Sequence, residues 1–197
     1  MKMLQLEEKA VVIDYLPLGK STDMTKQSIA QLLGMSYFTL LEATLKPASS
    51  LSIGEVVNVG KENRDKVEHI KGRITYDQLT TGAKNELKTA IRIVIMSREP
   101  DFVNFYNKSG AITMRVNQLA LLPGIGKKHL EAIINERERK PFESMADITK
   151  RVSLLPDPAN LLVQRIEQEL HGDEQHYLFV RPPSHAMDQP YGSFGRY

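Results

Sequence analysis

The chain of 197 residues contains no cysteine. This absence excludes a disulfide framework, a zinc site built from thiolates and a thiol nucleophile. The sequence also lacks a long apolar run and an amino-terminal signal segment, which predicts a soluble, cytoplasmic protein without a membrane segment. It has no strong excess of one charge, because 26 Lys and Arg face 24 Asp and Glu. A protein that wraps nucleic acid over its whole surface is therefore excluded, whereas one localised basic footprint is allowed.

The most informative run that is present covers residues 121–129 and reads LLPGIGKKH. Glycines on both sides of an apolar residue allow a tight turn and let a ligand come close to the main chain. The helix that follows begins with unsatisfied N–H groups and a partial positive charge, so it can hold a phosphate. The run resembles the hairpin of a helix-hairpin-helix motif, a module that grips nucleic-acid backbones without reading bases. The predicted nucleic-acid-binding residues are Gly124, Ile125, Gly126, Lys127, Lys128 and His129.

Two alternatives stay open for this hairpin, namely a plain glycine-rich turn between core helices and a hairpin that contacts only protein.

Thr113 is the predicted N-cap of a helix over residues 114–122. After the hairpin, an apolar face at helical spacing predicts a second helix, closed by cations that suit the helix dipole. The apolar residues are Leu130, Ile133 and Ile134, and the cations are Arg137, Arg139 and Lys140.

The pattern around the hairpin recurs 33 residues later, where Leu-Leu-Pro at residues 154–156 repeats residues 121–123. The second hairpin lacks both glycines. Asp157 would repel a phosphate, and Pro158 has no N–H to donate. We therefore predict one compact helical domain over about residues 113–170, in which only the first hairpin contacts nucleic acid.

The segment between the two copies, residues 141–148, resembles the connector of tandem helix-hairpin-helix domains. Asp147 is predicted to cap a helix over residues 148–155. Charge divides between the copies in the same way. Residues 108–140 hold seven Lys and Arg against three Asp and Glu, whereas residues 141–174 hold three against seven. The basic surface is thus assigned to the intact hairpin, with an ordinary solvated face as the alternative.

The first hundred residues have a different character. Short runs rich in β-branched residues, separated by turns, predict five strands, at residues 10–16, 28–33, 37–45, 56–60 and 67–74. Such a series favours a small barrel, and we expect an OB-like one. A helix is predicted over residues 84–97, broken at Glu99-Pro100, followed by a short helix over residues 101–107 whose aromatic residues belong to the core.

The predicted fold class is therefore α+β, an N-terminal OB-like β-barrel followed by an all-α tandem helix-hairpin-helix domain. The barrel covers residues 1–78, connecting helices 79–110 and the helical domain 111–171. Residues 172–197 form a C-terminal tail with one further strand at residues 177–180, which could return to the barrel.

A second group of cations lies on the predicted barrel, where a basic groove and stacked aromatics could bind a single strand. Tyr37 and Phe38 are the aromatic candidates. Interleaved acidic residues make a salt-bridged surface loop the competing interpretation. The secondary binding candidates are Lys61, Arg64, Lys71, Arg73 and, next to the helical domain, Arg115.

Several stretches together resemble an archaeal domain-of-unknown-function family that joins an OB-like barrel to a helix-hairpin-helix domain. They are residues 37–42, 82–87, 107–108 before 112–113, 122–128 and 141–144. The resemblance implies an RNA-binding protein linked to translation or ribosome maturation, which could associate with ribosomes and has no assigned enzymatic activity. It also implies that hairpin carbonyls could hold a monovalent cation, with no other cofactor.

Enzymatic alternatives find little support. A DNA-repair glycosylase would use a catalytic Asp about 20 residues after the hairpin, where Asp147 stands, but the Gly-Pro that should precede it is absent. A nuclease needs clustered carboxylates, and His171, His176 and His185 fit no strong metal-ligand spacing. We expect a non-enzymatic protein that binds RNA in preference to DNA. The alternatives are a DNA-binding repair or recombination factor and a protein-docking module.

Overall fold

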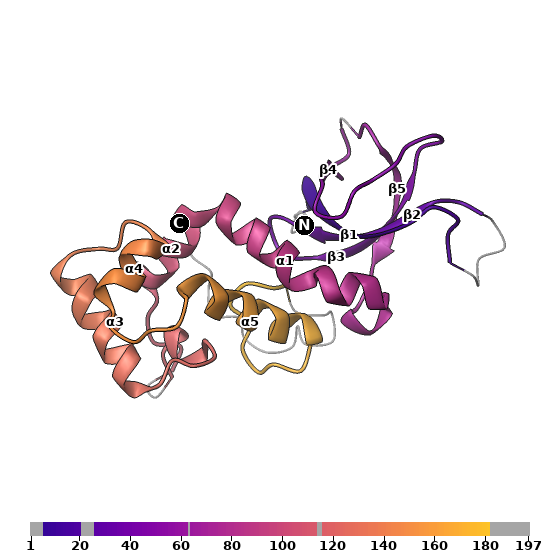
Figure 1. The fold of residues 1–197 in the computed structure, drawn as a ribbon. Helices are drawn as coiled ribbons and strands as arrows, with labels where there is room; N and C mark the ends of the chain where they lie inside the picture. The colour runs from indigo at the N-terminus through magenta and orange to yellow at the C-terminus, as the bar shows by residue number, and fades with distance from the viewer. Residues whose placement is uncertain (1–5, 21–25, 63, 114–115, 182–197) are drawn as a thin grey trace, which may run out of the picture.

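Five strands form one antiparallel sheet at one end of the molecule (Figure 1). The computed structural model describes residues 6–20, 26–62, 64–113 and 116–181. The strands lie in the order β4-β1-β2-β3-β5, whose first four members have the Greek-key arrangement. Within the described residues no pairing joins β4 to β5, so the curled sheet is an open half-barrel. The strands are β1 (Lys9–Leu16), β2 (Ile29–Gly34), β3 (Leu40–Leu45), β4 (Val56–Asn58) and β5 (Val67–Arg73).

The sheet buries side chains on both faces because successive residues of a strand point to opposite sides. On β1, Val11 and Ile13 join the core shared with helix α1 (Thr81–Ser97), whereas Ala10 and Val12 join a smaller core inside the curl. All five strands that the sequence predicts are present, at slightly different bounds.

The loop between β2 and β3 is held by a carboxylate, which explains why β3 begins at Leu40 and not at residue 37. Glu7 accepts hydrogen bonds from the N–H groups of Ser36, Tyr37 and Thr39 at 2.7, 2.9 and 3.2 Å. Gly34 makes room for this side chain, because a Cβ at that position would lie 2.1 Å from a carbon of Glu7. The same loop folds Phe38 into the core at 2% exposure. Phe38 is therefore unavailable for stacking on a base, contrary to the prediction from sequence.

Two consecutive helices lead away from the sheet. The first, α1, starts at Thr81, earlier than predicted, because the Thr80 hydroxyl accepts the Ala83 N–H at 3.0 Å and caps it. Only Arg98 separates α1 from α2 (Glu99–Lys108). Pro100 lies in the first turn of α2, where a missing N–H costs no hydrogen bond. The aromatic residues of α2 are core residues, as predicted, with Phe102 and Tyr106 buried.

The remaining helices lie at the other end and along α1. They are α3 (Lys127–Arg139), α4 (Met145–Arg151) and α5 (Pro158–His171). The helix predicted over residues 114–122 is wrong, because its described part, residues 116–122, forms only a 3-10 turn, η2 (Gln118–Leu121), which Asn117 caps. The cap predicted at Asp147 is also wrong. The Ser144 hydroxyl accepts the Asp147 N–H at 3.0 Å, so α4 begins earlier and ends at Arg151.

The segment after α5 is not the predicted strand. The Glu169 carboxylate accepts the N–H groups of Leu178, Phe179 and Val180 at 2.7, 2.9 and 2.8 Å. With their N–H groups taken by one side chain, these residues cannot pair with a strand edge. The Phe179 ring instead packs near Phe105, with centroids 4.9 Å apart.

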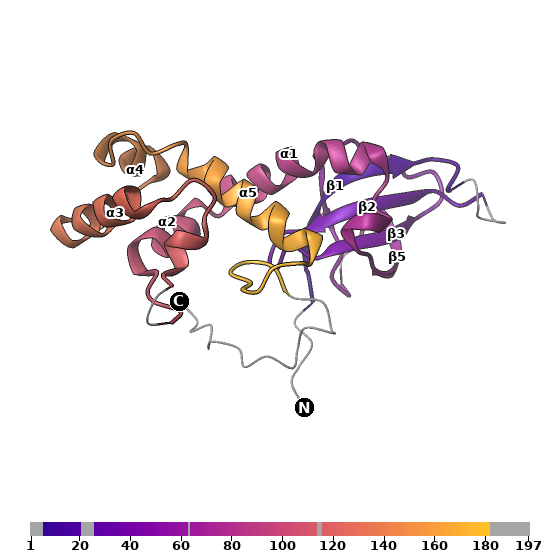
Figure 2. The same cartoon turned by 90° about the horizontal axis from the view of Figure 1, so that it is seen from below.

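The larger of the two apolar cores runs from the sheet to the helical end of the described structure. It includes Val11 on β1, Ile91 on α1, Ile133 on α3 and Ile166 on α5. Figure 2 shows α1 and α5 side by side between the sheet and the helical end. The core therefore continues across residues 78 and 110, where the sequence predicts domain boundaries.

Candidate nucleic-acid interface

The 121–129 run forms a tight turn that opens a helix, as the sequence predicts. Gly124 has a φ of 87°, in the left-handed region that favours glycine. The Ile125 N–H closes the turn on the Leu122 carbonyl at 3.1 Å, and the Ile125 side chain is buried. Gly126 is the N-cap residue of α3, with extended backbone. A Cβ at Gly126 would meet no atom within 4 Å, so the main chain faces open space there.

The N-terminus of α3 has no side-chain cap, because its N-cap residue, Gly126, is a glycine. No side chain accepts its first N–H groups and its first turn contains no acidic residue, whereas Ser144 caps α4 and Asp157 caps α5. The first N–H of α3 with an intrahelical acceptor is that of Leu130, which donates to Gly126 at 3.0 Å. Within the described residues, the preceding N–H groups are thus available to an external acceptor, with the partial positive charge of the helix behind them.

The side chains at this end are also available. The Lys127 side chain is 89% exposed and lies 4.0 Å from Glu131, at the outer limit of an ion pair. Lys128 is exposed. His129 lies back against the turn, with Nδ1 3.2 Å from the Gly124 carbonyl oxygen. The glycines, the lysines and His129 are therefore brought together at one surface.

The other cations of this region contact protein groups. Arg137 donates to the carbonyl oxygens of Tyr106 and Ser109 at 3.0 and 2.8 Å. Arg139 pairs with Glu136 at 2.9 Å, and Lys140 pairs with Glu143 at 2.7 Å. Among the described residues of 108–140, the cations available to an external ligand are therefore chiefly Lys127 and Lys128.

The second copy of the pattern uses its polar groups internally. Asp157 accepts the Ala159 N–H at 3.1 Å and pairs with Arg92 of α1 at 2.8 Å. Pro158 occupies the first turn of α5. Equivalent apolar positions are buried in both copies, Leu119 and Leu122 in the first and Val152 and Leu155 in the second. That this hairpin contacts no phosphate stays a prediction. Asp157 has a structural role, because it caps α5 and pairs with Arg92.

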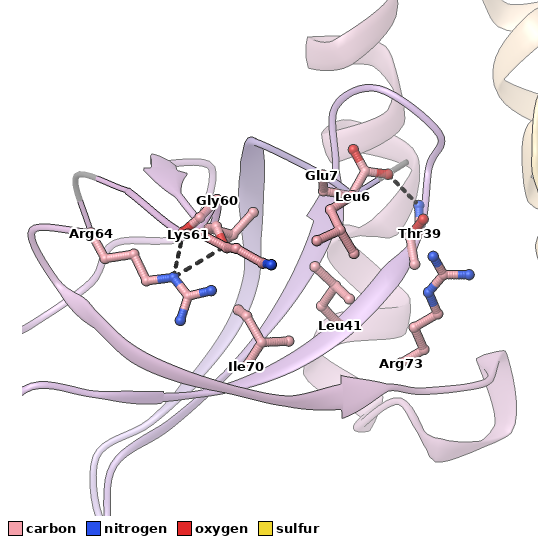
Figure 3. A pocket seen from close by; sticks show the side chains of 10 residues that line it. Leu6, Glu7, Thr39, Leu41, Gly60, Lys61, Arg64, Ile70 and Arg73 are labelled. Carbon is pink, nitrogen blue, oxygen red and sulfur yellow. Dashed lines mark hydrogen bonds between the residues drawn. The ribbon is translucent and has the colours of Figure 1, made fainter. Parts of the chain in front are cut away.

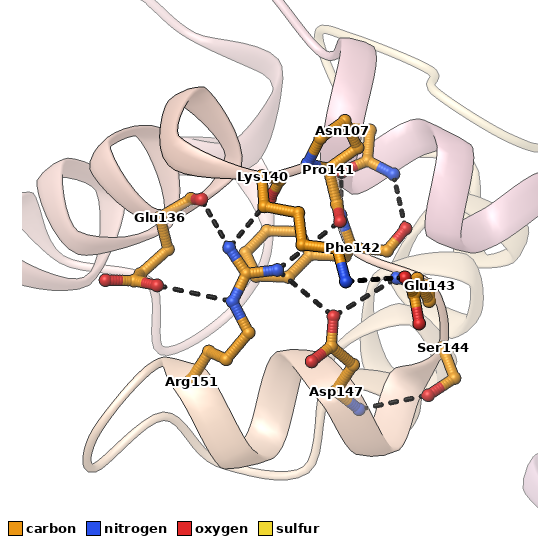
Figure 4. Close-up of polar contacts among 9 residues, drawn as sticks. All are labelled: Asn107, Glu136, Lys140, Pro141, Phe142, Glu143, Ser144, Asp147 and Arg151. Atoms are coloured by element: carbon orange, nitrogen blue, oxygen red, sulfur yellow. Dashed lines mark hydrogen bonds and ion pairs between the residues drawn. The ribbon is translucent and has the colours of Figure 1, made fainter.

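The connector between α3 and α4 is held by a network of polar contacts (Figure 4). The Asn107 amide exchanges two hydrogen bonds with the backbone of Phe142, at 2.7 and 2.9 Å. Arg151 closes the C-terminal end of α3, donating to the carbonyl oxygens of Glu136 and, at 2.7 Å, Lys140. The network fixes the angle between α3 and α4 and so the position of the hairpin.

Asp147, the candidate glycosylase residue, belongs to this network. Its carboxylate contacts Arg151 at 3.1 Å and accepts the Glu143 N–H at 3.2 Å. Desolvation opposes its ionisation, but these two contacts outweigh that effect and lower the pKa of Asp147. The arrangement gives Asp147 a structural role as an ionised group that holds the connector.

The secondary candidates separate into three groups. Lys61, Arg64 and Arg73 line one cavity on the half-barrel (Figure 3). Lys71 instead pairs with Glu42 on β3 at 3.0 Å. Arg115 lies outside the described residues. The sequence prediction missed the uncharged residues that complete the cavity, because isolated apolar residues on strands carry no functional signal of their own. They include Leu6, Thr39, Leu41 and Ile70.

Comparison with known proteins places the chain in a family. Residues 6–181 match the model of a family described as "Protein of unknown function (DUF655)". The chain belongs to this family. It is 41% identical over 182 residues to the uncharacterized protein MJ0038 of Methanocaldococcus jannaschii, covering 91% of this chain and 82% of that protein. The crystal structure of Af1531 from Archaeoglobus fulgidus, another DUF655 member, matches with a TM-score of 0.84 and 39% identity, over 89% of this chain and all of that one. The predicted membership of an archaeal family of unknown function is confirmed.

The described part of the chain contains neither a candidate membrane span nor a candidate metal site. Within residues 6–20, 26–62, 64–113 and 116–181, no helix has the length and apolar character needed to span a membrane. In the same part of the chain, no group of three or more histidine, aspartate or glutamate side chains could hold a metal ion. His185 lies outside it.

Proposed function

We propose that this DUF655 protein is a non-enzymatic nucleic-acid-binding protein that grips a phosphate backbone through the hairpin at residues 123–128. The observation that carries the proposal is the uncapped N-terminus of α3. Its free N–H groups, the open main chain at Gly126 and the exposed Lys127 and Lys128 lie together. Among the described helices, the N-termini of α1, α4 and α5 each have a side-chain cap, whereas that of α3 has none.

The folds of the two ends support the same class of ligand. A five-stranded Greek-key sheet with one unpaired gap fits a partly open OB barrel, an architecture that binds oligonucleotides. Two hairpins related by 33 residues and packed through equivalent buried positions fit a tandem helix-hairpin-helix domain. RNA is favoured over DNA because the resemblance described from the sequence implies RNA binding linked to translation, and the ribosome is the partner to examine first.

A substitution at Gly126 tests the proposal without disturbing the core. An aspartate there would accept the N–H groups of Lys128 or His129, as N-cap residues do, and would place a negative charge where the phosphate binds. We expect Gly126→Asp to leave the protein at least as stable, since its Cβ meets no atom, and to abolish binding. Gly126→Asn supplies the same cap without the charge and should weaken binding less.

The lysines provide the second test. Lys127→Glu with Lys128→Glu should weaken binding to RNA duplexes of different sequence uniformly, and it should reduce the salt dependence of the affinity. Lys26→Glu with Lys150→Glu, at two exposed lysines outside the hairpin, is the matched control. Fluorescence anisotropy over a series of salt concentrations measures both effects. Sequence-selective loss would contradict a backbone grip. Unchanged affinity would point to protein docking.

A further inference from the structure

A cavity of about 190 Å³ opens on the half-barrel, lined in part by β5 and by the loop between β4 and β5 (Figure 3). Its walls come from the chain before β1, from the start of β3, from the β4–β5 loop and from β5. Because β4 and β5 do not pair within the described residues, the outer edge of each strand has no neighbouring strand. The site lies on a different part of the fold from the hairpin, which is at the opposite end of the molecule (Figure 1).

The interior of the cavity is apolar. Leu41 of β3, Ile70 of β5 and Leu6 point into it from three sides (Figure 3). Leu6 is 47% exposed although it is a leucine, so ligand contact would remove apolar surface from water. Thr39, a wall residue, has a buried hydroxyl with no hydrogen-bond partner.

The rim of the cavity is positive. Lys61 and Arg73 reach toward it from opposite sides, and neither makes an ion pair or hydrogen bond within the described residues (Figure 3). Arg64 holds the β4–β5 loop by donating to the Val59 carbonyl at 3.1 Å and to that of Gly60 at 2.6 Å. The one carboxylate in the wall, Glu7, is occupied by three backbone N–H groups of the β2–β3 loop. The cavity therefore favours a ligand with an apolar body and a negative group.

Size narrows the choice of ligand. The cavity is smaller than the roughly 300–1,000 Å³ of sites for whole drug-sized ligands, so it suits one ring system with its charged group at the rim. A continuous single strand stacked on aromatic side chains is not favoured, because Phe38 is buried against Phe102 with centroids 6.2 Å apart. An unstacked base matches the apolar interior in chemical character, and its phosphate matches the positive charge of Lys61 and Arg73.

We propose that this cavity binds a single unstacked nucleotide, with the base against Leu41 and Ile70 and the phosphate between Lys61 and Arg73. The choice of a nucleotide rests on the proposed nucleic-acid function. The nucleotide can come from an unpaired position of the bound nucleic acid or from a free mononucleotide, and the two sources share this chemistry.

The test uses the full chain and three probes, namely a blunt RNA duplex, the same duplex with an unpaired single-stranded end, and the mononucleotides AMP and UMP. The wild type should bind the duplex with the unpaired end about tenfold more tightly than the blunt duplex, in the range of one base contact. Lys61→Ala with Arg73→Ala should remove this difference and leave blunt-duplex affinity nearly unchanged. Lys26→Ala with Lys150→Ala, which removes the same charge elsewhere, should preserve it.

A second variant addresses the interior without changing charge. Ile70→Phe fills the cavity with apolar atoms, so it should remove the preference for the unpaired end. Its melting temperature and far-UV spectrum show whether the sheet tolerates the larger side chain. If it does not, Ile70→Met replaces it as a less bulky change.

The outcomes separate this inference from the proposed function. The wild type could bind mononucleotides but no duplex, and the Lys61 and Arg73 double variant could lose the mononucleotide binding. That result would support the nucleotide site in the cavity and contradict the hairpin proposal. Duplex binding with no preference for the unpaired end, together with no mononucleotide binding, would contradict the nucleotide site in the cavity. The hairpin proposal would remain supported. Competition by AMP or UMP against the unpaired end would identify free nucleotides as a source, and its absence would identify the strand. No binding of any probe would overturn both.

Discussion

Glu169 offers the sharpest prediction about what holds this fold together. Its side chain is fully buried, accepts three backbone N–H groups of the segment after α5, and contacts Arg165 at 3.0 Å. Glu169→Gln keeps the shape of the side chain but removes its charge. It also turns one acceptor oxygen into an NH2 group, which would face N–H donors. Arg165 would keep its contacts with Glu174 at 2.9 Å and with the His176 carbonyl.

The expected cost follows from the number of groups left without a partner. At least one buried N–H loses its acceptor, and the buried guanidinium of Arg165 loses one of its two carboxylate partners. Removing one partner of a buried ion pair costs about 3–5 kcal/mol, and we expect a loss of unfolding free energy in that range. For a chain of this length the melting temperature should fall by roughly 6–20 °C.

Urea unfolding and amide hydrogen exchange measure the two consequences. The unfolding midpoint reports the total loss, and exchange of Leu178 and Val180 reports whether the segment detaches locally. Glu167→Gln is the matched control, since Glu167 lies on the same helix and pairs with the exposed Lys88 at 3.3 Å. That change should cost less than about 1 kcal/mol. A loss of stability in Glu169→Gln no larger than that in the control, or unchanged exchange of the two amides, would contradict this role for Glu169.

Three further outcomes follow from the described contacts. Leu155→Ala should lower the unfolding free energy by about 2–4 kcal/mol in urea titrations, because Leu155 is a core residue, 7% exposed. Asp157→Ala should cost about 1 kcal/mol through loss of the α5 cap yet change nucleic-acid affinity in anisotropy titrations by less than about twofold. Burial disfavours ionisation of Glu42, but hydrogen bonds from two lysines and Gln31 outweigh this effect and lower the pKa of Glu42. The ionised carboxylate should therefore stabilise the fold above about pH 4.5, and this stabilisation should be lost at lower pH. Glu42→Gln should make the melting temperature depend less on pH below about pH 4.5.

The parts of the fold that the sequence predicts are those with a local pattern. The apolar face of α1 repeats at helical spacing, and Gly124 and Gly126 mark a turn that only a few backbone conformations satisfy. Alternation and β-branched residues located all five strands. Each of these signals lies within one element, so it can be read without knowing what the element packs against.

The parts that the sequence prediction missed depend on contacts between distant residues. Glu7 holds a loop some 30 positions away, and Glu169 prevents the following segment from forming a strand. Neither carboxylate differs in the sequence from a solvent-exposed one. The α4 cap was assigned to the wrong residue because Ser144 and Asp147 are both good N-cap residues, and only the observed geometry decides between them. The cavity escaped prediction because its walls come from four separate segments.

The position of α1 has a consequence for how this family can change in length. Its start packs against β1 and β2, and its flank pairs with α5 through Arg92 and Asp157. A single residue inserted in the middle of α1 would turn everything beyond it by about 100° and advance it by about 1.5 Å. The hairpin would then face a different direction from the cavity. Insertions and deletions among relatives should therefore collect in loops such as that between β4 and β5, while the number of residues in α1 stays constant.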